Sequence, residues 1–174
     1  MNRQDIIDKM TPSEKKVFEK YKDTYPFPIR KFIEEIGIKI VCNEDEQNLA
    51  EMYEKDGAFY MHISKHHEVG VQAKDMSYLV LFMHHLFTRN NAFLNEYTCE
   101  IKKLNEEMKI LLSVFLMPLD VFKRQVRKFN CNAKKLSKYF GVPTGAIEFY
   151  AEYLKAKTIG LDPYSNSDDN IKYH

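Results

Sequence analysis

Apolar residues near the start of the chain recur three and four positions apart, which is the spacing of a helix that buries one face. Residues 11–14, Thr-Pro-Ser-Glu, are typical of a helix start, because proline suits the first turn and acidic charge suits the positive end of a helix. A second helix is predicted over about 28–36, where Gly37 is a typical terminator. The alternation of apolar and polar residues over 38–41 then indicates a strand.

The following segment has the pattern of a β-hairpin. A strand is predicted around 50–53, and residues 55–57, Lys-Asp-Gly, form a turn of the Asp-Gly type that joins antiparallel strands. The returning strand is predicted over 58–63, which is rich in aromatic residues. Together these segments predict a small antiparallel sheet.

From about Lys74 onward, helical spacing continues almost to the end of the chain. Pro118 interrupts it, while Asn132 and Gly141 are typical of a helix start and a helix end. The predicted helices cover about 75–88, 97–117, 119–128, 133–140 and 144–155. We therefore predict one α+β domain over 1–156, in which a small antiparallel sheet packs on a helical bundle. A polar tail over 157–174 is expected to be flexible.

Composition narrows the class of protein. The 174 residues are 44% hydrophobic and 29% charged, which is typical of a single globular domain rather than a membrane protein. A net charge of +1 gives no overall attraction for nucleic acid or for a membrane surface. The three cysteines, Cys42, Cys99 and Cys131, are widely spaced and odd in number. We expect neither a disulfide framework nor a zinc knuckle, and a cytoplasmic location.

The segment 83–88 follows an apolar helical run, which is where a zinc peptidase would carry the motif H-E-x-x-H. In that motif, two histidines four positions apart share one helix face and bind one Zn²⁺, while the glutamate acts as general base. In this chain His84 holds the first position, His85 replaces the glutamate and Thr88 replaces the second histidine. The segment therefore keeps the setting of the motif but lacks its base and one of its ligands.

Over roughly 26–154 the chain resembles the ImmA/IrrE family of metallopeptidase-like proteins. The clearest marker is 115–118, Phe-Leu-Met-Pro, which is similar to the stop that ends a helix after the family's zinc motif. The resemblance implies a zincin-like core with extra C-terminal helices. In the family, a glutamate on that helix is the third zinc ligand. Counted back from Pro118, its position is held by Asn105, with Glu106 and Glu107 next to it.

We expect no cofactor, no bound metal and no catalytic residue, so that His84, His85 and Thr88 are relics of the family's site. Neighbouring residues on a helix diverge by about 100°, so two adjacent histidines seldom share a metal. If zinc is bound nevertheless, the candidates at the relic site are His84, Asn105, Glu106 and Glu107, and the candidates for a surface site are His62, His66 and His67.

Residues 132–155 are similar to a helix-turn-helix pair with Gly141 at its turn. Basic residues, with no acidic residue among them, gather over the segment 121–138: Lys123, Arg124, Arg127, Lys128, Lys134, Lys135 and Lys138. Such a patch suits phosphate groups. The second helix of the pair, however, offers no Arg, Lys, Asn or Gln to base edges and carries Glu148 and Glu152. We therefore expect no nucleic-acid partner.

The resemblance implies a function as well as a fold. Active members of the family are implied to cleave or disable repressors, often on phage or mobile elements. We expect this chain to be a catalytically silent relative that binds a partner protein, with a repressor-type regulator as the candidate partner and no membrane partner. Two alternatives stay open. One is a zinc metallo-endopeptidase with substitute ligands that cleaves a repressor-like protein, and the other is a DNA-binding regulator that uses the C-terminal helices.

Overall fold

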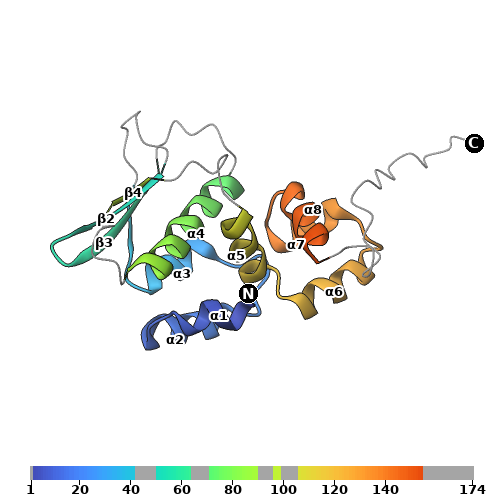
Figure 1. Cartoon of the computed structure of the whole chain (residues 1–174), viewed down its shortest axis with the longest axis horizontal. Helices are drawn as coiled ribbons and strands as arrows, with labels where there is room; N and C mark the ends of the chain where they lie inside the picture. Colours follow the sequence, from blue (N-terminus) through green and yellow to red (C-terminus); the bar gives the residue numbers. More distant parts are fainter. Residues whose placement is uncertain (1, 42–49, 64–70, 90–95, 99–105, 155–174) are drawn as a thin grey trace, which may run out of the picture.

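The structure is a computed structural model that describes residues 2–41, 50–63, 71–89, 96–98 and 106–154 (Figure 1). Its helices are α1 Arg3–Asp8, α2 Pro12–Tyr21, α3 Ile29–Glu35, α4 Val71–Thr88, α5 Glu106–Leu116, α6 Leu119–Lys128, α7 Ala133–Phe140 and α8 Thr144–Tyr153. Its strands are β1 Lys39–Val41, β2 Ala50–Lys55, β3 Ala58–Ile63 and β4 Glu96–Thr98. The described chain thus combines helices with a small sheet and is mostly helical. No described helix is both long enough and apolar enough to cross a membrane.

The start of α2 is fixed by a reciprocal pair of hydrogen bonds. The Thr11 hydroxyl accepts from the backbone N–H of Glu14 at 3.3 Å, and the Glu14 carboxylate accepts from the backbone N–H of Thr11 at 2.6 Å. This capping box satisfies two backbone donors that a helix start leaves unpaired. The helix start predicted at 11–14 is confirmed.

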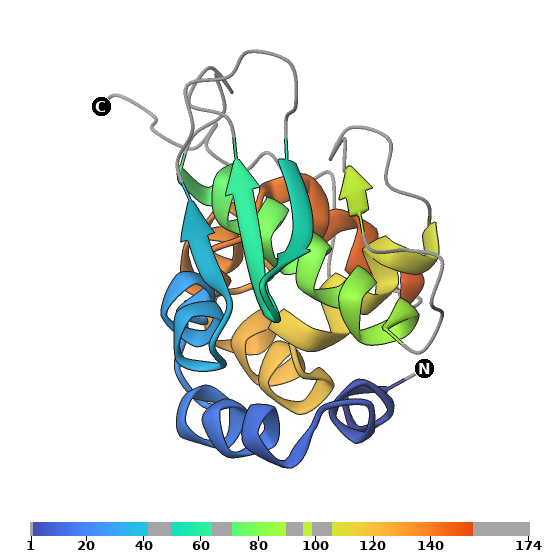
Figure 2. The same cartoon turned by 90° about the vertical axis from the view of Figure 1, so that its left-hand side faces the viewer.

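The sheet has the strand order β1-β3-β2-β4 (Figure 2). Strands β2 and β3 form the predicted antiparallel hairpin, and its turn residues Asp56 and Gly57 both have positive φ, as an Asp-Gly turn requires. The prediction of a purely antiparallel sheet is wrong, because β1 pairs with β3 in the parallel direction. Alternation along 38–41 indicates which side chains share a face but not which strand becomes the neighbour, so it could not fix the direction of pairing.

One face of the sheet lies against helices. Met52 and Met61 are paired across β2 and β3, and both are buried on the face that α4 contacts. The opposite face carries the stacked rings of Tyr53 and Tyr60, whose centroids are 5.4 Å apart. Figure 2 shows the helices gathered behind the sheet, with this second face turned toward the viewer. The hairpin therefore contributes one side to the core and leaves the other outside it.

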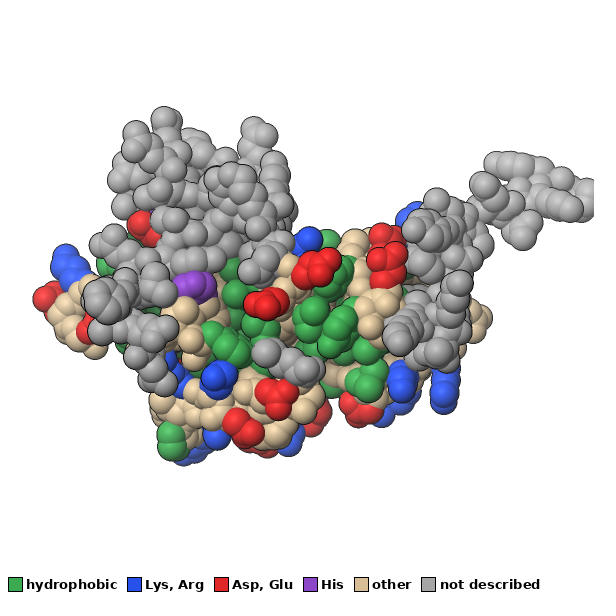
Figure 3. Space-filling model, viewed as in Figure 1, with side chains coloured by type: hydrophobic (Ala, Val, Ile, Leu, Met, Phe, Trp, Pro, Cys, Tyr) green, Lys and Arg blue, Asp and Glu red, His purple; other side chains and the backbone are tan. Residues whose placement is uncertain are grey.

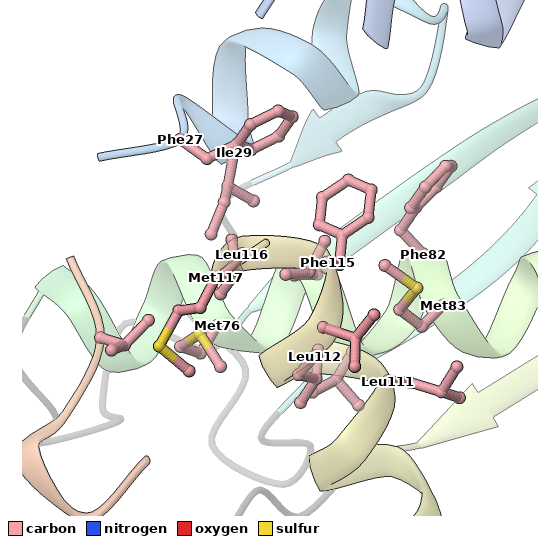
Figure 4. Close-up of a cluster of buried hydrophobic side chains, with 14 of the residues drawn as sticks. Phe27, Ile29, Met76, Phe82, Met83, Leu111, Leu112, Phe115, Leu116 and Met117 are labelled. Carbon is pink, nitrogen blue, oxygen red and sulfur yellow. The ribbon is translucent and has the colours of Figure 1, made fainter. Parts of the chain in front are cut away.

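The core forms where α4 meets α3 and α5. Figure 4 shows Phe82 and Met83 of α4 near Phe115 and Leu111 of α5. Phe32 of α3 joins them, with its ring 5.2 Å from that of Phe82 and almost perpendicular to it. Aromatic rings in such edge-to-face contact add stability beyond the area that they bury. This packing places the His84 end of α4 on a rigid support.

The helix predicted over 97–117 is wrong in its first part. Glu96–Thr98 forms β4, which pairs antiparallel with β2, and the described helix α5 covers Glu106–Leu116. The free edge of β2 can accept a strand at this point, and that long-range pairing overrides the helical spacing of the apolar residues. Residues 99–105 lie outside the described part of the chain, so the helical position of Asn105 stays a prediction.

The C-terminal helices agree with the prediction. Asn132 caps α7 by accepting from the backbone N–H of Lys135 at 2.9 Å, and Gly141 ends α7 with φ of 68°. A Cβ atom at Gly141 would lie 2.7 Å from the Cβ of Pro26, so this turn needs glycine for space as well as for conformation. The close approach holds the turn between α7 and α8 against the segment that precedes α3.

Candidate functional site

The predicted relic site, His84, His85 and Thr88, lies at the C-terminal end of α4, where His84 and Thr88 are one turn apart. The Thr88 hydroxyl donates to the backbone carbonyl of His84 at 2.8 Å and lies 3.3 Å from the His84 Nδ1. Both side chains are half-buried. The position that carries the second histidine in a zinc peptidase therefore holds a hydroxyl that is bonded to its own helix.

His85 stands at the position that carries the glutamate in H-E-x-x-H, and its ring is packed against another side chain. Its ring lies edge-on to Phe59 of β3, with 4.5 Å between centroids. The backbone carbonyl of His85 also accepts from the N–H of Arg89 at 2.9 Å. This places the imidazole between the sheet and the end of α4, where its contact with Phe59 fixes the ring.

Arg89 ties the end of α4 to the start of α2. Its guanidinium donates to both carboxylate oxygens of Glu14, at 3.0 and 2.9 Å, and also to the backbone carbonyl of Lys9. Glu14 is buried, and its carboxylate also accepts the capping bond from Thr11. Both carboxylate oxygens are reached from one nitrogen, Nη1, and such charge-assisted hydrogen bonds are stronger than hydrogen bonds between neutral groups. Glu14 was predicted only as part of a helix start, and Arg89 lies just beyond the helix predicted over 75–88, so no pattern in the sequence indicated that the two residues meet.

The surroundings favour the uncharged form of both histidines. Burial lowers the pKa of His84. Burial also lowers the pKa of His85, the nearby charges of Arg89 and His84 lower it further, and the Glu14 carboxylate opposes them. Withdrawal from water penalises a charged imidazole. Each ring therefore titrates below the ordinary range for histidine.

The metal candidates are not brought together in the described part of the chain. Glu106 and Glu107 are exposed in the first turn of α5. Asn105, His66 and His67 lie outside the described residues. Across residues 2–41, 50–63, 71–89, 96–98 and 106–154, no three His, Cys, Asp or Glu side chains form a group that could hold a metal ion.

His62 is not a surface residue, and the prediction that placed it in a surface metal site is wrong in this respect. It is 3% exposed, and its strand, β3, lies between β1 and β2. Its Nδ1 lies 3.1 Å from the Oε1 of Glu51, directly across the β2–β3 pair. The Nε2 atom is buried and has no hydrogen-bond partner in the described structure. His62 thus belongs to a cross-strand pair.

All seven basic residues of α6 and α7 are exposed, as a surface patch requires. The next helix, α8, does not offer a matching face for reading bases. Gly145 and Phe149 line a cleft that α8 shares with α5, Glu148 is half-buried and Glu152 is exposed. Major-groove readers place donors and acceptors at such positions on a free helix face. The patch is therefore suited to contacts with negatively charged groups rather than to the recognition of a base sequence.

A larger cleft, of about 590 Å³, lies where α1, the start of α6 and the end of α8 meet. Leu119 and Tyr153 line it, and they are the large hydrophobic side chains that the described structure leaves exposed, at 44% and 42%. Tyr150 lies beneath, and burial raises its pKa to about 12. Figure 3 shows hydrophobic side chains gathered on this face beside the C-terminal helices, with acidic side chains next to them. Exposed apolar groups with a polar border are typical of surfaces that bind proteins.

The chain was compared with protein-family models, with curated proteins and with solved structures, and none of the three comparisons found a match.

Proposed function

We propose that this protein is a catalytically silent relative of the ImmA/IrrE metallopeptidases and that it works by binding a partner protein. The observation that carries the proposal is the geometry of Thr88, whose hydroxyl is bonded to the carbonyl of His84 where a metal ligand is needed. A catalytic zinc site typically uses three protein ligands and one water. Of the three positions, only His84 retains a residue that binds zinc. A zincin-like core is part of the proposal, supported by the packing of α4 on α5 and on the sheet.

The larger cleft is the surface that best suits a partner protein. Its exposed large hydrophobic residues, Leu119 and Tyr153, are an aliphatic and an aromatic group, and Tyr153 stacks on Tyr150 with 6.2 Å between ring centroids. Aromatic side chains on a firm support are the residue types that dominate binding energy in protein interfaces. We propose a repressor-type regulator as the partner class, because the family to which the resemblance points acts on such proteins.

An active peptidase with substitute ligands is less well supported. His85 could in principle accept a proton near neutral pH. However, its ring is packed against Phe59, while Glu106 and Glu107 are exposed at the start of a different helix. The DNA-binding alternative has one observation in its favour, the seven exposed basic residues. It has against it the acidic residues Glu148 and Glu152 on α8.

Metal analysis tests the silent state. The purified chain, saturated with zinc and passed over a mild chelator, should retain far less than one zinc per molecule. The triple change His85→Glu, Thr88→His and Asn105→Glu should raise the zinc content, and it serves as the positive control. One zinc per chain in the wild type, lost in His84→Ala, would revive the peptidase.

Partner binding is tested separately. Proteins that co-purify with the tagged chain are identified, produced in pure form and titrated against wild type and against Leu119→Glu/Tyr153→Glu. The double variant should bind at least about 10-fold more weakly, since the few anchor side chains that dominate an interface each cost more than about 1 kcal/mol when they are lost. Lys123→Glu is the control, because Lys123 is exposed and does not line the cleft. Equal binding by the double variant would exclude this surface.

A further inference from the structure

A second cleft, of about 320 Å³, lies between α5 and α8 and has a different chemistry. Its walls are apolar side chains from three parts of the chain: Met76 of α4, Leu112 and Leu116 of α5, and Ala146 and Phe149 of α8. Figure 4 shows Met76 of α4 near Leu116, the last residue of α5, and near Met117, which follows it. Small-molecule sites are typically clefts of roughly this size or larger, with apolar walls and few polar groups. The cleft therefore suits a small, mostly apolar ligand.

The two ends of this cleft differ. At one end Met117 and Val142 are 0% and 1% exposed, so the lining there is buried. At the other end Lys109 is exposed, and its Nζ lies 5.8 Å from the centroid of the Phe149 ring. Among the described residues that line the cleft, Lys109 is the one that carries a charge. The cleft thus has an apolar floor and a cationic opening.

The cationic opening is not already neutralised by the described part of the chain, where no carboxylate forms an ion pair with Lys109. Its ammonium group instead lies over an aromatic face, which attracts cations but leaves their charge uncancelled. A ligand with one negative group at its end and an apolar body would match both features. A dianion or a phosphate ester would find only one cation beside an apolar wall.

We propose that this cleft binds an amphiphilic monocarboxylate, with its alkyl chain between α5 and α8 and its carboxylate at the Nζ of Lys109. The methionines on the floor favour an alkyl chain, because thioether side chains adapt to flexible apolar partners. The site is separate from the relic site and from the cleft that carries Leu119 and Tyr153. Its occupation is independent of the proposed binding of a partner protein.

The test is a calorimetric titration of the purified full chain with hexanoate, octanoate and decanoate, and with octanol as an uncharged comparison. Affinity should rise about 4-fold for each added CH₂ group until the cleft is filled. In Lys109→Gln, octanoate should bind about 5-fold more weakly, as expected for one partly exposed ion pair, while octanol should be unchanged. Lys128→Gln is the matched control, because the Nζ of Lys128 also lies over a phenylalanine ring, at 5.7 Å, but not in the cleft.

A filling variant and a direct probe complete the test. Ala146→Phe should abolish binding of both octanoate and octanol by occupying the cleft. A measurement on the wild type does not depend on whether that variant folds: octanoate should shift the methyl resonances of Met76 and Met117, but not those of Met52 and Met61 in the sheet. Absence of saturable binding, unchanged octanoate affinity in Lys109→Gln, or shifts confined to the sheet would each overturn the proposal.

Discussion

The polar residues at the end of α4 and those of the cleft between α5 and α8 differ in what they contact. At the end of α4, the Thr88 hydroxyl bonds its own helix, the His85 ring packs on Phe59, and Arg89 binds Glu14. In the cleft, Lys109 stands at the opening and is exposed. Polar groups in the first region stabilise the fold, whereas the cation of the second remains accessible to a ligand.

This difference indicates which residues of the chain are still able to bind a ligand. The motif draws attention to α4, yet its polar side chains there are already engaged in contacts within the protein. A residue that is satisfied by the fold has little capacity left for a ligand or a substrate. The exposed residues of the two clefts, which no motif marks, retain that capacity.

The largest effect is expected where the end of α4 depends on its ion pair. Arg89→Met should lower the free energy of unfolding by about 3 kcal/mol, because it leaves the carboxylate of Glu14 buried without its cation. The side chains of Arg89 and Glu14 are only 19% and 10% exposed, so water replaces little of the lost interaction. Urea unfolding measures the change. Arg127→Met, at an exposed position of α6, is the control and should stay within about 0.5 kcal/mol of wild type. If the two changes lowered the free energy of unfolding equally, the ion pair at the end of α4 would not contribute to stability in the way proposed here.

The next effect concerns the turn that holds α7 and α8 in place. Gly141→Ala should destabilise the protein by about 2 kcal/mol, because alanine is strained at φ of 68° and its Cβ would contact Pro26 at 2.7 Å. Gly145→Ala, within α8 and with open space at its Cβ, should instead stabilise by up to about 1 kcal/mol. Thermal unfolding of both variants gives the answer. Opposite signs are expected, and a loss at Gly145 would contradict this account of the α8 surface.

A smaller effect is expected from the hydroxyl that replaces a metal ligand. Thr88→Val keeps the shape of the side chain but removes its hydrogen bonds to His84, which should cost about 1 kcal/mol. Thr88→Ser keeps the hydroxyl and is the control. Chemical denaturation distinguishes them. If Thr88→Val is as stable as wild type, the hydroxyl is available for another role and the relic site must be reconsidered.

The smallest effect is a dependence of stability on pH that arises at the same end of α4. The folded-state pKa values of His84 and His85 are lowered, so below the ordinary histidine value the unfolded chain binds more protons than the folded chain. The contribution of these two uncharged histidines to the free energy of unfolding is fully present above about pH 6.5. It is lost as the pH falls through that value toward the folded-state pKa values. Urea midpoints between about pH 8 and pH 5 should fall less steeply for His85→Gln than for wild type. Identical slopes would show that His85 is not shielded from water.

Local signals in the sequence were sufficient to predict much of the fold. The capping residues of α2 and α7, the Asp-Gly turn and the glycine that ends α7 each act within a few residues, so their outcomes could be predicted directly. The parallel pairing of β1 with β3, and the strand β4 in place of a helical turn, depend on edges of a sheet that form elsewhere in the chain. Residue spacing carries no information about such edges.

The candidate site was less predictable than the fold for the same reason. The helical position of His84, His85 and Thr88 followed from the pattern, but the contact of His85 with Phe59 requires the hairpin to be placed first. His62 was named as a candidate for a surface metal site, yet it is buried and pairs with Glu51 across the hairpin, a contact that residue spacing does not reveal. Lys109 and Phe149 lie on separate helices, and neither belongs to a motif that would have paired them.

The ion pair between Glu14 and Arg89 also bears on the order in which parts of the chain can pack during synthesis. Helix α2 leaves the ribosome well before the end of α4 does, because Glu14 and Arg89 are 75 positions apart. Until Arg89 has emerged, the Glu14 carboxylate has only the N–H of Thr11 as its partner and gains nothing from leaving water. Helices α1 and α2 therefore lack this anchor to α4 while the hairpin and α4 are being made. A nascent chain stalled just before Arg89 should expose this N-terminal segment to proteases.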